Sequence, residues 1–118
     1  MGRVIHFELT AADTDAAARF FASAFGWRST PSPFAPQYLT TETGEGRGID
    51  GAVMSAGYQQ QSVILWIDVD DLVATRAAVE SSGGRSVGGI NEVPGQGLMA
   101  YVADPSGVLY GLRQSSAR

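Results

Sequence analysis

The sequence contains no cysteine and no lysine, and its only histidine is His6. Without cysteine the chain cannot form disulfides, thiol nucleophiles or thiolate metal ligands. Without lysine, the N-terminal amine is the only amine left for Schiff-base chemistry. Any acid–base or metal chemistry must therefore depend on one imidazole, on carboxylates and on hydroxyl groups.

A basic run and a long apolar segment are also missing. The formal net charge is -4 and the sequence pI is about 4.7. We therefore expect no binding to nucleic acid or to an anionic membrane surface. No apolar run approaches the roughly 18 residues of a membrane span, and residues 1–6 lack the apolar region of a signal peptide. These absences predict a cytoplasmic protein.

The composition is that of a globular domain. Of the 118 residues, 44% are hydrophobic and 17% are charged. This length is within the range of one domain and is sufficient for a hydrophobic core. We expect a single domain over residues 1–118.

Two amphipathic helices are predicted. Apolar residues from Ala17 to Phe25 recur at helical spacing after Asp13, a good N-cap, and Gly26 follows as a terminator. Asp70 or Asp71 is placed to cap a second helix over residues 72–82, before Gly83 and Gly84. We interpret the two aspartates as caps rather than as a catalytic pair.

Strands are predicted around these helices. Residues 3–9 alternate, with His6 and Glu8 on one face, and residues 63–69 are apolar on both faces, as in a central strand. Residues 98–103 and 108–113 flank Asp-Pro-Ser-Gly, the signature of a tight turn. A short strand is predicted over residues 85–87. The glycine-rich residues 88–97 and the proline-rich residues 30–36 are predicted to form loops.

The element order repeats. When the chain is shifted by 58 residues, Asp13 falls on Asp71 and Gly26 on Gly84, and residues 49–54 fall on 107–112. Two matched helix caps and one strand order at a single shift indicate an internal duplication. The predicted fold is α+β, with two βαβββ units over residues 1–58 and 59–118.

This pattern resembles the vicinal oxygen chelate superfamily, which includes glyoxalase I, bleomycin-resistance proteins and extradiol dioxygenases. The resemblance covers most of the chain and rests on residues 5–9, the helix from Asp13 to Trp27, residues 69–72, Gly83-Gly84 and residues 104–107. It implies a curved, cup-like mixed sheet with one helix on the outer face of each unit. It implies little about function, because one fold carries many activities.

The resemblance also implies four metal-ligand positions, one from the first and one from the fourth strand of each unit. In this sequence they are His6, Val53, Ile64 and Gly111. Catalytic metals usually take about three protein ligands, and only His6 is a possible ligand here. We expect no cofactor, with Glu8 beside His6 as the one further ligand if a divalent metal binds.

Strand parity predicts the lining of the cup. If His6 faces it, then Glu8, Trp66, Leu109 and Arg113 share that orientation. His6 and Glu8 are candidate acid–base residues. Candidate ligand-binding residues are Trp66, Trp27, Tyr101, Leu109 and Arg113. Tyr38 and Phe34 are further candidates for a pocket rim that strand parity does not place. Structural alternatives stay open: a hydrogen-bonded His6 without catalytic function, a core Trp66 and a solvated Arg113.

Three functions follow from these residues. The first is a metal-free, bleomycin-resistance-like protein that binds a small organic molecule in the cup. The second is a glyoxalase-like lyase or isomerase that acts on a small carbonyl compound through His6 and Glu8. The third is an interaction module without a ligand. The resemblance further implies a homodimer.

Overall fold

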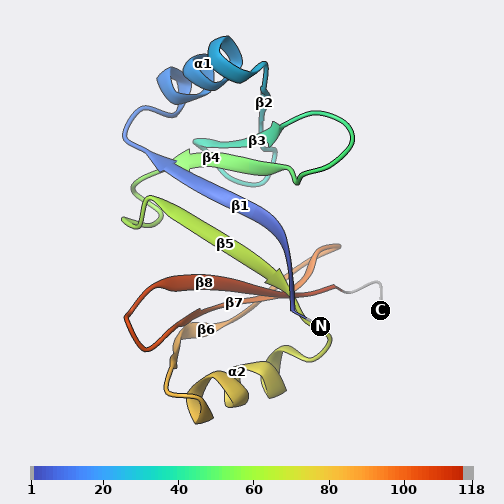
Figure 1. The fold of residues 1–118 in the computed structure, drawn as a ribbon, viewed down its shortest axis with the longest axis vertical. Helices are drawn as coiled ribbons and strands as arrows, with labels where there is room; N and C mark the ends of the chain where they lie inside the picture. Colours follow the sequence, from blue (N-terminus) through green and yellow to red (C-terminus); the bar gives the residue numbers. More distant parts are fainter. Residues whose placement is uncertain (1, 116–118) are drawn as a thin grey trace. The chain divides into compact units, whose positions relative to one another are not determined.

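The computed structural model describes residues 2–115, which divide into two compact units (Figure 1). The first unit comprises residues 6–64, and the second comprises the remaining described residues. The chain runs β1 (Arg3–Ala11), α1 (Thr14–Phe25), β2 (Arg28–Pro31), β3 (Tyr38–Glu42), β4 (Gly51–Ser55), β5 (Val63–Asp68), α2 (Leu72–Ser81), β6 (Arg85–Val93), β7 (Gly97–Ala103) and β8 (Leu109–Gln114). This order confirms the predicted α+β fold of two βαβββ units.

Each unit has the same strand arrangement. The strand order is β2-β3-β4-β1 in the first unit and β5-β8-β7-β6 in the second. The first and fourth strands of each unit pair in parallel, and the other neighbours are antiparallel. No helix in the described part of the chain is long and apolar enough to span a membrane. The cytoplasmic location stays a prediction.

The helix caps form as predicted. Asp13 accepts a hydrogen bond from the Ala16 amide, and Gly26 ends α1 in the left-handed conformation, with φ 75°. Asp71 accepts from the Ala74 amide at the start of α2. Here the left-handed residue is Gly83, with φ 98°, rather than its neighbour Gly84. Each cap satisfies a backbone group that the helix end leaves unpaired.

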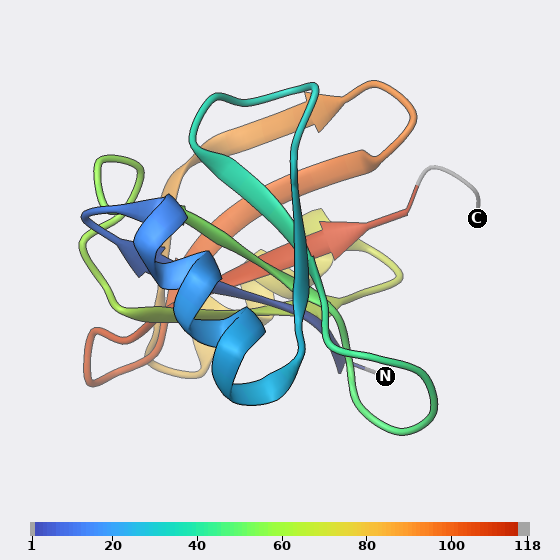
Figure 2. The same ribbon diagram turned by 90° about the horizontal axis from the view of Figure 1, so that it is seen from above.

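One face of each sheet is covered by its own helix (Figure 2). In the second unit, Leu72 of α2 packs in the core against side chains from β7 and β8, among them Val102 and Leu112. In the first unit, Phe21 of α1 stacks on Trp27, which contacts Phe7 of β1. The opposite face of each sheet is called the helix-distal face below.

Two sequence predictions about loops are wrong. Residues 88–97 were expected to form a loop, but β6 continues to Val93 and pairs with β7 across a register shift between Val87 and Asn91. Gly88 has φ 68°, which a bulge accommodates within a strand. Thr30 and Pro31 also lie in a strand rather than in the expected loop. Because β2 is at the edge of its sheet, Pro31 can lack an N–H there.

Candidate functional site

In the first unit, His6 and Glu8 meet through a third residue, Tyr38. The Tyr38 hydroxyl donates to Glu8 Oε2 at 2.6 Å and lies 3.0 Å from His6 Nε2. The strand register explains this arrangement, since Glu8 pairs with Ala52 on β4, and Ala52 pairs with Thr40 on β3. Tyr38, two residues before Thr40, therefore projects from the same helix-distal face as His6 and Glu8.

The direction of these bonds fixes the histidine tautomer. Because the Tyr38 proton goes to Glu8, the phenolic oxygen accepts from Nε2–H of His6. In the neutral ring Nδ1 is then the basic nitrogen. Glu8 is only 5% exposed, so its carboxylate is a buried polar group that depends on hydrogen bonds. The sequence indicates Tyr38 only as a possible contributor to a pocket rim, and it does not predict the hydrogen bonds to His6 and Glu8.

In the second unit, Trp66 and Tyr101 form an aromatic pair on the helix-distal face. Their ring centroids are 5.3 Å apart and their planes are inclined by 52°. Trp66 of β5 is 8% exposed and pairs with Gly111 of β8. A Cβ atom at position 111 would overlap the indole ring. Gly111 therefore provides the space that Trp66 occupies.

Leu109 and Arg113 project from β8 on the same face as Gly111, as strand parity predicted. Arg113 Nε donates to the Gln96 carbonyl at 3.3 Å. The guanidinium is thus attached to the turn between β6 and β7 and is half-buried. Trp66, Tyr101, Leu109 and Arg113 therefore project from the same face of this sheet.

Trp27 does not join His6 and Glu8. It stacks on Phe21 at 4.9 Å and contacts Phe7 at 5.8 Å. Phe7 lies between His6 and Glu8 in sequence and therefore points to the opposite face of β1. The structure places Trp27 under α1, on the helix-covered face.

Val53 also faces the helix side, because it pairs with Leu9 rather than with Glu8. Glu8 of β1 pairs with Ala52 of β4, and the equivalent Trp66 of β5 pairs with Gly111 of β8. The spacing between the units is 58 residues for the first pair of equivalent positions, Glu8 and Trp66, but 59 residues for their strand partners. The duplication is therefore offset by one residue in its last strand. The position equivalent to Gly111 is Ala52, which is equally unable to bind a metal.

The metal-ligand set implied by the resemblance does not fit these residues. His6 Nε2 and Glu8 Oε2 are both hydrogen-bonded to Tyr38. Ile64 is fully buried and apolar, and Gly111 lies against Trp66. Within residues 2–115 no group of three or more His, Asp or Glu side chains is arranged to hold an ion. Two ligands from one strand are fewer than catalytic sites use.

The pKa of Tyr110 departs clearly from its usual value. Partial burial raises the pKa of Tyr110 above 10.0, and the hydrogen bond and negative charge of Asp104 raise it further. The hydroxyl donates to Asp104 Oδ2 at 3.2 Å. This pair belongs to the turn from 104 to 107, where Asp104 also accepts from the amides of Ser106 and Val108. It stabilises the turn and does not face the helix-distal side.

The arrangement of strands and helices defines a class of protein, the two-unit βαβββ fold of the glyoxalase, bleomycin-resistance and dioxygenase superfamily. A member from Vibrio splendidus is 18% identical, with a TM-score of 0.69, covering 98% of this chain and 100% of that one. A family model described as "Glyoxalase-like domain" matches residues 5–112. The chain therefore belongs to the glyoxalase-like domain family.

The chain is also similar to proteins from mycobacteria. The Mycobacterium tuberculosis protein named "Putative glyoxylase CFP32" is 29% identical over 115 residues, and the M. bovis protein of that name matches equally. The match covers 92% of this chain but only 44% of those proteins, so the chain spans less than half their length. The methylmalonyl-CoA epimerase of M. tuberculosis is 18% identical, with a TM-score of 0.69, covering 96% of this chain and 87% of the epimerase.

Proposed function

We propose that this glyoxalase-like protein binds a small organic molecule on the helix-distal face of the second unit, against Trp66 and Tyr101, without the superfamily's metal. The observation that carries the proposal is the contact between Trp66 and Gly111. A large aromatic ring lies where the resemblance expects a metal ligand, and position 111 has no space for a side chain. An aromatic and aliphatic surface with one guanidinium is typical of sites for planar ligands that carry an anionic or carbonyl group.

Tryptophan fluorescence tests this proposal, because the chain has only two tryptophans. Trp66 lies on a helix-distal face, beside Tyr101, and Trp27 lies on a helix-covered face, beside Phe21. The variant Trp27→Phe keeps Trp66 as the sole emitter, and Trp66→Phe keeps Trp27. We expect planar carboxylates and carbonyl compounds to quench the fluorescence of Trp66 in Trp27→Phe in a saturable way. The same titrations should leave Trp66→Phe unchanged.

Two results would contradict the proposal. One is quenching that persists in Trp66→Phe with unchanged affinity. The other is the absence of saturable quenching of Trp66 across a broad set of planar metabolites. Near-ultraviolet circular dichroism of both variants serves as the control for folding.

A second candidate function is a lyase or isomerase that acts on a small carbonyl compound. The hydrogen-bonded series His6–Tyr38–Glu8 favours it, because it holds the imidazole in one tautomer and couples it to a buried carboxylate. Structural neighbours with the same fold include methylmalonyl-CoA epimerases, whose substrate is a carbonyl compound. In this proposal His6 transfers the proton and Tyr38 with Glu8 orients its ring.

Exchange of substrate protons with deuterium from the solvent tests this second candidate. Carbonyl compounds that bind are incubated in deuterated buffer and followed by proton NMR. Exchange should fall by about 10²–10⁴-fold in His6→Gln, the usual size of a general-base contribution, and by less in Tyr38→Phe. Tyr58→Phe is the matched control, since that hydroxyl bonds only to the Pro36 carbonyl. Exchange that persists in His6→Gln would eliminate this function.

A further inference from the structure

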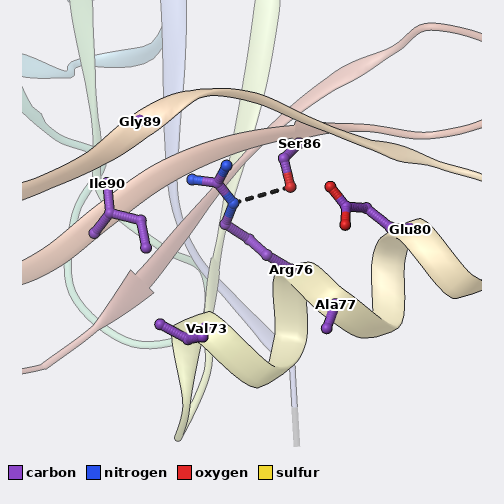
Figure 3. A pocket seen from close by; sticks show the side chains of 7 residues that line it. All are labelled: Val73, Arg76, Ala77, Glu80, Ser86, Gly89 and Ile90. Atoms are coloured by element: carbon purple, nitrogen blue, oxygen red, sulfur yellow. Dashed lines mark hydrogen bonds between the residues drawn. The ribbon is translucent and has the colours of Figure 1, made fainter.

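A groove on the outer side of the second unit, between α2 and β6, holds an arginine whose hydrogen bonds are incomplete. The groove has a volume of about 490 Å³ and is remote in the fold from the helix-distal face. Its lining comprises Val73, Arg76, Ala77, Glu80, Ser86, Gly89 and Ile90. Figure 3 shows the Arg76 and Glu80 side chains directed from α2 toward β6.

Arg76 is oriented by two bonds to β6. Its Nε donates to Ser86 Oγ at 3.0 Å, and its Nη2 donates to the Gly88 carbonyl at 3.0 Å. Its Nη1 is buried and has no acceptor, the only such buried side-chain nitrogen or oxygen in the described part of the chain. A buried cationic N–H without an acceptor is costly, so the site favours an added anion.

Arginine presents a planar fork that suits carboxylate and phosphate. The bond from Nη2 to Gly88 is solvent-exposed, and exposed bonds contribute little net free energy. The guanidinium can therefore rotate from Gly88 toward the groove and bring Nη1 to a ligand. No ion pair joins Arg76 to Glu80 in the described structure, so both charges are available to a ligand.

Glu80 restricts the kind of anion. It is exposed on the same helix face, four residues after Arg76, where its negative charge repels phosphates and dicarboxylates. A ligand that carries an ammonium group beside its carboxylate instead satisfies both residues. The groove also contains the exposed apolar side chains of Val73 (62%) and Ile90 (41%), which suit an aliphatic group.

We propose that this groove is a binding site for a small zwitterion with an aliphatic group, an apolar α-amino acid. Its carboxylate accepts from Arg76, its ammonium donates to Glu80, and its side chain contacts Val73 and Ile90. The site is separate from the proposed function, which depends on Trp66 and the opposite face of the sheet.

Titration of ¹⁵N-labelled protein with L-leucine, followed by NMR, tests the proposal. We expect saturable shifts in α2 and in residues 86–90. Two analogues separate the charges: 4-methylpentanoate lacks the ammonium group, and 3-methylbutylamine lacks the carboxylate. Both should bind about tenfold or more weakly than leucine, the usual effect of losing one charged hydrogen bond.

Variants complete the test. Glu80→Gln should bind leucine and 4-methylpentanoate with equal affinity. Arg76→Gln should bind each of them about tenfold or more weakly than the unaltered protein does. Because Arg76→Gln also removes bonds to β6, Glu80→Gln on the exposed helix surface serves as the variant that cannot disturb the core. Arg19→Gln, on the exposed side of α1, is the charge-matched control and should bind leucine normally.

The absence of saturable shifts with leucine would overturn the proposal, as would equal binding of the amine or undiminished binding by Arg76→Gln. Trp66→Phe separates this site from the proposed function, because it should leave leucine binding unchanged. Loss of leucine binding in Trp66→Phe would place the amino acid on the helix-distal face and overturn the groove assignment.

Discussion

The indole ring of Trp66 lies directly against the backbone of Gly111, so close that a Cβ atom there would overlap the ring. This contact joins the two parallel strands β5 and β8 of the second unit. It makes the size of residue 111 and the position of Trp66 interdependent.

Gly111→Ala should therefore destabilise the protein. Overpacking a tight site costs about 1–3 kcal/mol, because the ring must move or the strands must separate. Urea unfolding measures the loss, and near-ultraviolet circular dichroism should report a displaced indole. Gly89→Ala is the control, since nothing lies within 4 Å of a Cβ there, and it should be near neutral. Equal stabilities of the two variants would show that Trp66 does not occupy this position.

Tyr38→Phe should destabilise the first unit more than Tyr58→Phe does. Both changes remove one hydroxyl donor, but Tyr38 donates to the buried carboxylate of Glu8, whereas Tyr58 donates to an exposed carbonyl. Removing a hydrogen-bond donor from a buried charged acceptor costs about 1–3 kcal/mol. Urea unfolding near neutral pH compares the two variants. An equal or greater loss in Tyr58→Phe would contradict the importance of the Tyr38–Glu8 bond.

Tyr110 should make stability sensitive to alkaline pH. Its pKa in the folded chain lies above the ordinary 10.0 because of partial burial and the neighbouring Asp104. A raised pKa means that the fold favours the neutral phenol. Its contribution is therefore fully present below pH 10.0 and is lost as pH rises through the raised pKa.

Ultraviolet titration of the tyrosinate signal measures this shift directly. Asp104→Asn should lower the pKa of Tyr110, since it removes the negative charge, and Tyr110→Phe should remove the contribution of Tyr110 to the titration curve. In urea unfolding at alkaline pH, the free energy of unfolding should fall less steeply with rising pH in Tyr110→Phe than in the unaltered protein. The same steepness in both proteins would contradict the prediction.

Association of two chains stays a prediction, and α1 provides the surface that supports it. Phe20 and Phe25 are 60% and 61% exposed although they lie on the apolar side of an amphipathic helix. Exposed aromatic clusters favour protein contacts. Sedimentation should show a dimer that Phe20→Ser with Phe25→Ser weakens. A monomer at all concentrations would contradict the homodimer.

Local chemistry determined which parts of the fold were predictable. α1 and its caps follow from Asp13, Gly26 and the helical spacing between them, all within a few turns. The continuation of β6 beyond Val87 was missed because Gly88 and Gly89 look like a loop in isolation, whereas pairing with β7 keeps them in a bulged strand. Tertiary pairing prevailed there over local propensity.

The site was predictable only where one strand contains it. His6 and Glu8 share a face by parity alone. The bond from Tyr38 to Glu8 was not predicted because it spans 30 residues and depends on a register that sequence does not give. Val53 was assigned to the wrong face because the duplication is offset by one residue, and a one-residue slip reverses a side chain's direction.

The central claim is that Trp66 and Tyr101 bind an organic ligand without a metal. The most direct measurement is the ligand affinity of Trp27→Phe before and after treatment with a chelator, with elemental analysis of untagged protein. We predict the same dissociation constant in both samples and less than stoichiometric divalent metal. One metal ion per chain that is lost in His6→Ala, together with loss of ligand binding after chelation, would contradict the account.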